Sequence, residues 1–350
     1  MSWDNPDKNK KQHHRHRKDN AINIIAVTAV SVILLIAFLL PVFRKTEKGK
    51  ENPTVPKAET VNAPNARGVL KNGGETLSIS KSAETVLVIG LDKSDEQIKE
   101  EIGDFYNEQM ADFLMYMVFD NENMRVDFIQ INRDTICEVP WLSVNGMRGG
   151  TQTEQICFAH IYGSGGKDSC ENTAEAVNMH LFNAPVDHYL SFSLDSIPAI
   201  NDVVGGVEVT INDDFSSVDK TLVQGETIRL NGRQAEHFVR ARSGVGKGEN
   251  TERMARHRQY LESFVKASRA AYEKNPNLSA DAYNAVKNSL VTDLTSAGVQ
   301  RFADRLNTYE LGEIRHAAGT SAISSETGWV EFYVDKDDLW SIVKETLTHK

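Results

Sequence analysis

The sequence predicts an α/β domain, in which a mixed central sheet is flanked by helices, preceded by one N-terminal transmembrane helix. Two observations predict the domain. Short apolar runs that end in polar residues are typical of buried strands, and they alternate with longer segments of helical apolar period. A third observation predicts the membrane helix, because residues 21–43 form one apolar segment long enough to cross a bilayer.

Length and composition limit the possible classes of protein. The chain has 350 residues and 40% hydrophobic residues, enough to bury one large core or two smaller ones. Its formal net charge of -10 argues against nucleic-acid binding, which requires a broad basic surface. The three cysteines exclude a complete disulfide framework, but an external domain could form one disulfide. Cys157 and Cys170 are the nearest pair in sequence.

The N-terminal region predicts a single-pass protein of the cell membrane. Residues 1–20 read as a basic tail, and no small-residue cleavage pattern follows residues 21–43, so we expect an uncleaved anchor. The positive-inside rule places the tail in the cytoplasm and the C-terminal part of the chain outside the cell. Residues 44–80 read as a linker, and residues 81–350 as the extracellular domain.

Three apolar runs of the first half predict strands with charged residues at their ends. The runs are Val86–Asp92, Phe113–Phe119 and Val126–Ile131. Ligands of open α/β sheets bind at strand ends, and two carboxylates near a basic cluster fit a hard cation that bridges to phosphate oxygens. The alternative is that these aspartates only form turns. The strand-end residues are Asp92, Asp112, Arg133 and Asp134.

The other elements follow from periodicity and turn residues. Gly163–Ser169 looks like a phosphate loop but lacks the spacing of that motif, so it is interpreted as an ordinary loop. Residues 228–232 are expected to form a turn. Helices are predicted over 172–182, 196–204, 233–238, 280–290 and 296–306 and from a cap at Asp335 to about 347, and strands over 186–193, 207–211 and 329–334.

A basic stretch over residues 238–259 runs against the acidic background. Arg240 and Arg242 alternate as in a strand, residues 243–250 read as a glycine-rich loop, and residues 251–266 read as a helix. On that helix, three basic side chains share one side because of their spacing. Guanidinium groups in fixed geometry suit a multiply charged phosphate, whereas the alternative is a solvated basic helix face. The three helix residues are Arg253, Arg256 and His257.

Nine short motifs, in order from about residue 84 to the end, resemble the LytR-CpsA-Psr (LCP) family of cell-wall phosphotransferases. Each motif alone is weak, but nine in the same order are specific. They are Val86–Asp92, Ala111–Asp112, Ile131–Thr135, Ala159–Gly163, Val186–Leu190, Val204–Val209, Leu230–Gly232, Val239–Arg242, and Arg253 with Arg256.

The resemblance implies an LCP-type α/β sandwich that binds a polyprenyl-pyrophosphate-linked glycopolymer, with the lipid tail in an apolar tunnel. It implies transfer of the glycan phosphate to a peptidoglycan hydroxyl. Asp92 and Asp112 match the carboxylates that hold Mg²⁺. The implied catalytic arginines around the pyrophosphate are Arg133, Arg240, Arg242 and Arg253, and Asp134, Arg256 and His257 are further candidates for substrate binding.

Three positions depart from the family pattern. Met110 replaces an arginine, Asn250 replaces an aspartate, and His257 replaces a glutamine. An alternative is therefore a non-catalytic, membrane-anchored protein that binds polyprenyl phosphate or wall polymer. An anchored signalling or adhesion domain, or a phosphatase acting on pyrophosphate lipids, also fits the anchor and the basic cluster.

Overall fold

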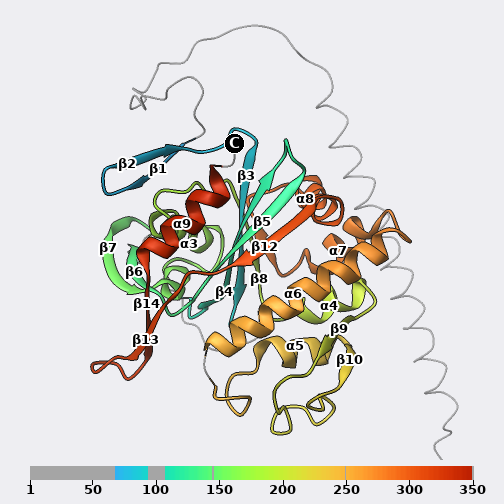
Figure 1. The fold of residues 1–350 in the computed structure, drawn as a ribbon. Helices are drawn as coiled ribbons and strands as arrows, with labels where there is room; N and C mark the ends of the chain where they lie inside the picture. Colours follow the sequence, from blue (N-terminus) through green and yellow to red (C-terminus); the bar gives the residue numbers. More distant parts are fainter. Residues whose placement is uncertain (1–67, 94–106, 144–145, 249, 349–350) are drawn as a thin grey trace, which may run out of the picture. The chain divides into compact units, whose positions relative to one another are not determined.

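A computed structural model describes residues 68–93, 107–143, 146–248 and 250–348 (Figure 1). The predicted basic tail 1–20, the predicted membrane helix 21–43 and most of the predicted linker lie outside these residues. Within the described ranges, no helix combines the length and the apolar character needed to span a membrane. The N-terminal anchor therefore stays a prediction.

A six-stranded mixed sheet forms the centre of the domain, which confirms this part of the predicted fold class. The pairs β3–β4, β4–β5 and β8–β11 are antiparallel, and the pairs β3–β8 and β5–β12 are parallel. In sheet order the strands are β11 (Leu290–Thr292), β8 (His188–Phe192), β3 (Ala83–Leu91), β4 (Ala111–Asp120), β5 (Arg125–Ile131) and β12 (Glu310–Arg315).

Helices cover both faces of this sheet (Figure 1). On one face the core includes side chains from α3 (Lys167–His180) and α9 (Lys336–Leu347). On the other face it includes side chains from α6, α7 and α8. Asp335 accepts hydrogen bonds from the backbone of Asp337 and Asp338, as predicted for the cap of the last helix. The helices of the second face are α6 (Asn250–Tyr272), α7 (Leu278–Val286) and α8 (Ser296–Thr308).

A second, smaller core lies beside α6. It buries side chains of β9 (Val207–Thr210), β10 (Thr227–Leu230) and α5 (Gly232–Arg240), with α4 (Ser196–Val203) packed against it. Residues 228–230 therefore form part of a strand rather than the predicted turn. They pair with Val207–Val209, and this ladder supplies backbone hydrogen bonds that the local sequence does not announce.

The predicted strand over Arg240 and Arg242 is wrong. Arg240 is the last residue of α5, and Arg242 lies in the loop that follows. A capping box of Asn231 and Gln234 starts α5. Its buried residues 235, 238 and 239 have helical spacing, so burial in the second core extends the helix through the arginine.

Three antiparallel hairpins and a short 3-10 helix complete the domain. The hairpin β1–β2 falls within residues 44–80, which were predicted to be a linker without regular structure. Leu70 of this hairpin is fully buried, and Lys71 N donates to Phe182 O, so tertiary packing orders a segment of weak periodicity. The elements are β1 (Val69–Asn72), β2 (Glu75–Ser78), β6 (Ile136–Leu142), β7 (Arg148–Gln155), η2 (Ile156–His160), β13 (Gly319–Ile323) and β14 (Val330–Val334).

The three cysteines are free thiols, so the candidate disulfide between Cys157 and Cys170 does not form. Cys170 Sγ lies 3.9 Å from Nε2 of His160 in the core. Burial raises the pKa of Cys157 to about 12, which keeps this thiol protonated at neutral pH.

Candidate active site

Strand register places the charged strand-end residues at one end of the sheet. Leu91 pairs with Ala111 in the antiparallel β3–β4 ladder, so Asp92 lies opposite Met110, and Asp112 lies beside the register shift at Leu91 on the neighbouring strand. Leu114 pairs with Ile131 across the antiparallel β4–β5 ladder. Two further steps along that ladder bring Asp112 opposite Arg133, although the two lie far apart in the chain.

Asp112 is the centre of an ionic cluster. Its Oδ1 contacts Nη1 of Arg133, and its Oδ2 lies 2.5 Å from Nη1 of Arg253. Nε of Arg133 lies 3.2 Å from Oδ1 of Asp134. The Asp112 side chain is 20% exposed, whereas those of Arg133 and Arg253 are 10% and 6% exposed. Two nearly buried guanidinium groups thus share one carboxylate that solvent can reach.

Two asparagines that were not predicted as site residues position this cluster. Asn250 Oδ1 accepts from Nε and Nη2 of Arg253 at 3.2 and 2.9 Å. Asn250 Nδ2 donates to Oδ1 of Asn132 at 2.7 Å, and the backbone N of Asp134 donates to the same oxygen at 3.0 Å. Asn250 precedes Arg253 by three residues on α6, a spacing that could have identified it from the sequence.

Asp92 lies beside the cluster and interacts with the backbone of Met110. Met110 N donates to Oδ1 of Asp92 at 2.7 Å, and Asp92 N donates to Met110 O at 3.1 Å. Burial raises the pKa of Asp92, against the opposing effects of the Met110 hydrogen bond and the charge of Arg133. Met110, which replaces the family arginine, places its sulfur 3.4 Å from Nη2 of Arg133. The cluster therefore has a thioether at the position where the family resemblance implies a third positive charge.

Burial and, second, the neighbouring positive charge of Arg133 together lower the pKa of Arg253 to about 10. The group remains a cation at neutral pH. The cluster of Asp92, Asp112, Asp134, Arg133 and Arg253 carries one excess negative charge when all five groups are ionised, and the charge of nearby Lys93 also acts on Asp92. Such a set can bind an added cation together with the oxygens of a phosphate.

The donor set fits a Mg²⁺ ion that arrives with a phosphate. Mg²⁺ is usually held by one or two carboxylates while phosphate oxygens and waters complete its shell. Asp92 and Asp112 supply two carboxylates from adjacent strands, and Asp134 Oδ2 is buried without a hydrogen-bond partner among the described residues. The described residues contain no group of three or more metal-binding side chains, so they form no complete protein cage.

Arg256 and His257 do not join this cluster. Arg256 Nη1 lies 2.9 Å from Oδ2 of Asp213, and its other nitrogens donate to the carbonyls of Phe238 and Ala241. His257 Nε2 lies 2.8 Å from Val239 O. These contacts hold α6 against the end of α5 and the loop after it.

Arg240 and Arg242 also lie outside the cluster. Arg240 is exposed and its Nη1 lies 3.5 Å from Oε1 of Glu236. Arg242 Nε donates to Gly248 O at 3.2 Å. Among the described residues, neither arginine makes a hydrogen bond or ion pair with Asp112, Arg133 or Arg253. Arg240 at the end of α5 and Arg242 in the loop that follows are therefore not part of the ionic cluster.

Comparison with known proteins places these features in context. The sequence model of the LytR_cpsA_psr family matches residues 46–347 of this chain. A Bacillus mycoides (strain KBAB4) protein named polyisoprenyl-teichoic acid--peptidoglycan teichoic acid transferase TagU is 26% identical over 238 residues, which cover 68% of this chain and 69% of that protein. The protein of the same name from Bacillus subtilis (strain 168) is 27% identical over 231 residues, which cover 64% of this chain and 65% of that protein.

A solved structure of a Streptococcus agalactiae protein has the same fold. Its TM-score is 0.61 at 18% identity, and the match covers 77% of this chain and 89% of that one. The aligned stretches in the two Bacillus proteins span about two thirds of those proteins' own lengths.

Proposed function

The chain belongs to the LytR-CpsA-Psr family, and from this premise we propose that it transfers a glycopolymer phosphate from a polyprenyl-pyrophosphate carrier to a peptidoglycan hydroxyl. The observation that carries the proposal is the sharing of Asp112 by Arg133 and Arg253 at the sheet end. The transferase names of the Bacillus relatives support the same reaction class.

The arginines supply charge neutralisation and orientation. A pyrophosphate at the cluster offers Arg133 and Arg253 several oxygens in exchange for the single carboxylate of Asp112, and bidentate contacts would fix its orientation. Phosphoryl transfer depends mainly on such positioning and electrostatic stabilisation. Within the described ranges Arg242 donates to the neutral carbonyl of Gly248, and we propose that its charge also serves the same ligand.

In the proposed reaction the hydroxyl oxygen of the acceptor attacks the phosphorus that carries the glycan. A new P–O bond forms to this oxygen, the bond to the bridging oxygen breaks, and polyprenyl phosphate leaves. Asp92 accepts the hydroxyl proton, a role favoured by its raised pKa and by the absence of direct guanidinium contact among the described residues. Mg²⁺ held by Asp92 and Asp112 would supply further neutralisation of the phosphate charge.

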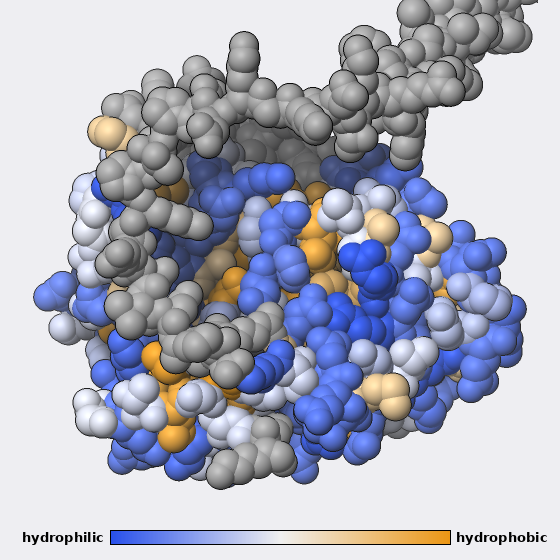
Figure 2. Space-filling view, turned by 90° about the horizontal axis from the view of Figure 1, so that it is seen from above, coloured by the Kyte–Doolittle hydropathy of each residue, from blue (hydrophilic) through white to orange (hydrophobic). Residues whose placement is uncertain are grey.

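The prenyl tail is proposed to pack on the sheet face that lies behind the cluster. Half-buried apolar side chains there include Val88, Phe113, Phe192 and Leu261, and Phe113 directly follows Asp112. Figure 2 looks onto the sheet end that holds the β4–β5 turn, and it shows apolar residues at the floor of a hollow with a hydrophilic rim. An apolar tunnel between these two ends would suit a long isoprenoid chain.

The proposal includes a membrane anchor over residues 21–43, with the catalytic domain outside the cell. This orientation would give the cluster access to both a lipid carrier and the wall polymer. It is testable by protease accessibility of the C-terminal domain on intact cells: protection of residues 81–350 from added protease would reject it.

The reaction is tested with the full chain in detergent micelles. The assay mixes the purified protein with Mg²⁺, a radiolabelled polyprenyl-pyrophosphate glycopolymer and peptidoglycan fragments. We expect it to yield labelled peptidoglycan. Arg133→Gln should lower the rate by about two orders of magnitude. The exposed Arg233→Gln removes the same charge elsewhere and should keep the rate of the wild type. Failure of the wild type to transfer label, in the presence of tight donor binding, would select the non-catalytic binding protein.

A further inference from the structure

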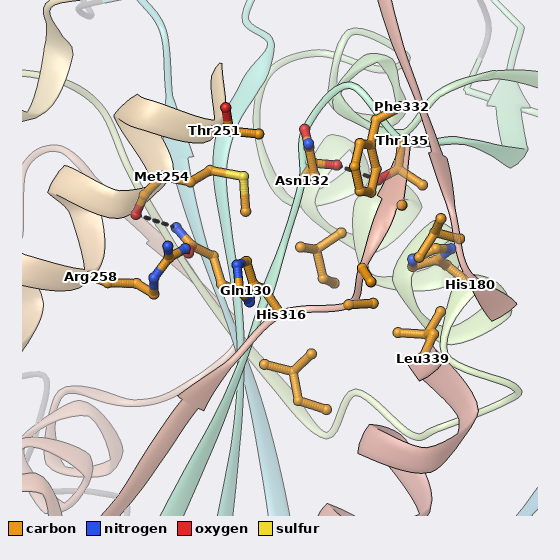
Figure 3. Close-up of a pocket in the computed structure, with 16 residues that line it drawn as sticks. Gln130, Asn132, Thr135, His180, Thr251, Met254, Arg258, His316, Phe332 and Leu339 are labelled. Carbon is orange, nitrogen blue, oxygen red and sulfur yellow. Dashed lines mark hydrogen bonds between the residues drawn. The ribbon is translucent and has the colours of Figure 1, made fainter. Parts of the chain in front are cut away.

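A cavity of about 260 Å³ lies next to the ionic cluster, and the mechanism above does not use it. Residues from β5, α6, β14 and α9 line it, together with the segment that follows β12 (Figure 3). Asn132 belongs to its wall, and Asn132 Oδ1 accepts from Asn250, which holds Arg253. A ligand that contacts Asn132 in this cavity would therefore be linked by two successive hydrogen bonds, through Asn250, to Arg253 of the proposed reaction centre.

The cavity contains a cation whose contact partner is a neutral amide rather than a carboxylate. Arg258 is half-buried, and its Nη1 donates to Oε1 of Gln130 at 2.7 Å. Within the described ranges no carboxylate lies at ion-pair distance from Arg258, and Glu262, four residues further along α6, acts on it through its charge at longer range. Gln130 is itself 3% exposed and donates through Nε2 to Met254 O, so it fixes the guanidinium. A partly desolvated, unpaired charge costs free energy that an anion would recover.

Two histidines add hydrogen-bonding capacity on opposite sides of the cavity. Figure 3 shows His316 beside Gln130 and Arg258, and His180 across the cavity near Leu339. Burial and, second, the positive charge of Arg258 lower the pKa of His316, which agrees with their closeness. Gln130, Arg258 and His316 thus form one polar side of the cavity, and His180 lies on the other side.

We infer that this cavity binds an oxyanion carried by a substrate sugar, with Arg258 as its main charged contact. The substrate context rests on the proposed function, because only the neighbouring cluster defines what reacts. Typical small-molecule sites have volumes of about 300–1,000 Å³, and the volume of this cavity is smaller. A cavity of this size suits one charged sugar unit. Polar groups such as Arg258 line one side of the cavity and apolar side chains such as Phe332 and Leu339 line the rest, which matches the mixed surface of a sugar. A carboxylate of an acidic peptidoglycan sugar and a phosphate of the glycopolymer have the required chemistry.

Calorimetric titration of the full chain in micelles tests the site, with saturating inorganic pyrophosphate present to occupy the cluster. The probes are N-acetylmuramic acid, glycerol 3-phosphate and the neutral N-acetylglucosamine. We expect one charged probe to bind while the neutral sugar binds at least tenfold more weakly. Arg258→Gln should weaken binding of that probe at least tenfold, whereas Arg233→Gln should leave it unchanged.

A second variant guards against misfolding of the first. Gln130→Glu keeps Arg258 but gives it an internal carboxylate, so it should weaken the charged probe to a similar extent. Arg253→Gln should lose pyrophosphate affinity and keep probe affinity. The identity of the bound probe assigns the anion to the acceptor or to the donor.

The inference is overturned if neither charged probe binds the wild type, or if both Arg258→Gln and Gln130→Glu bind like the wild type. Its failure is separable from that of the proposed function. Probe binding that depends on Arg258, in a protein without transferase activity, would reject the proposed reaction and leave the anion site standing.

Discussion

Arg253 and Arg256 lie one turn apart on α6 and are both 5% exposed, yet the two regions around them differ in kind. Around Arg253 the acceptors are the shared carboxylate of Asp112 and the amide oxygen of Asn250. Around Arg256 they are the carboxylate of Asp213 and two backbone carbonyls. The first region faces a solvent-accessible carboxylate at the sheet end, and the second joins α6 to α5.

This difference shows how identical side chains acquire different tasks. A guanidinium that donates to fixed backbone carbonyls cannot release them without breaking a helix contact, so Arg256 is committed to the fold. A guanidinium that shares a carboxylate with Arg133 can exchange it for a phosphate with more oxygens. The sequence spacing predicted both arginines as substrate contacts, but only Arg253 lies in the cluster.

Arg253→Gln is the change expected to affect activity most. We expect kcat/KM for transfer to fall about 100- to 1,000-fold, because one preorganised donor to the phosphate is lost. In urea unfolding, Arg253→Gln should lose less stability than Arg256→Gln. Equal activity of Arg253→Gln and the wild type would remove Arg253 from the site.

Arg256→Gln should affect stability instead. We expect the free energy of unfolding to fall by about 3 kcal/mol, since Asp213 and two carbonyls lose their partner. This expected loss lies at the lower end of the range for breaking a buried ion pair, because the Asp213 side chain is 26% exposed. The activity per folded molecule should stay within about twofold of the wild type. A loss of activity as large as that of Arg253→Gln, in folded protein, would erase the distinction between the regions.

His257→Gln sharpens the comparison through pH. Burial holds the pKa of His257 at about 3, below its ordinary value of about 6.5. The unfolded chain therefore binds a proton that the folded chain does not, and stability falls as pH drops below 6.5. Glutamine does not titrate, so the variant lacks the contribution of His257 to this acid sensitivity. The slope of the free energy of unfolding against pH should therefore be smaller in the variant by up to about 1.4 kcal/mol per pH unit.

Urea denaturation of both proteins at pH 7.5 and pH 5 measures this difference. Little difference is expected at pH 7.5, where His257 is neutral in both states. Burial also lowers the pKa values of His160 and His180 to about 4. These two histidines remain in the variant, so it should retain part of the acid sensitivity of the wild type. Equal slopes for variant and wild type would show that His257 titrates normally in the folded state.

The central strands were predictable because their apolar runs are long and their ends are polar. Asp112 and Arg133 were also predictable as neighbours, since both flank runs that pair in an antiparallel ladder. The strand over Arg240 and Arg242 failed because a two-residue alternation is too short to outweigh the helical burial of Phe238 and Val239. The β1–β2 hairpin failed because its order comes from packing of Leu70.

The sequence by itself determined the alternation of strands and helices, the cap at Asp335 and the residue types suited to a phosphate, because these depend on local spacing and side-chain chemistry. Only the tertiary structure decided which arginines share Asp112, which are saturated by carbonyls and which, like Arg258, contact a neutral amide. The physical reason is that a charged group is defined by its partners, and those partners come from segments far apart in the chain.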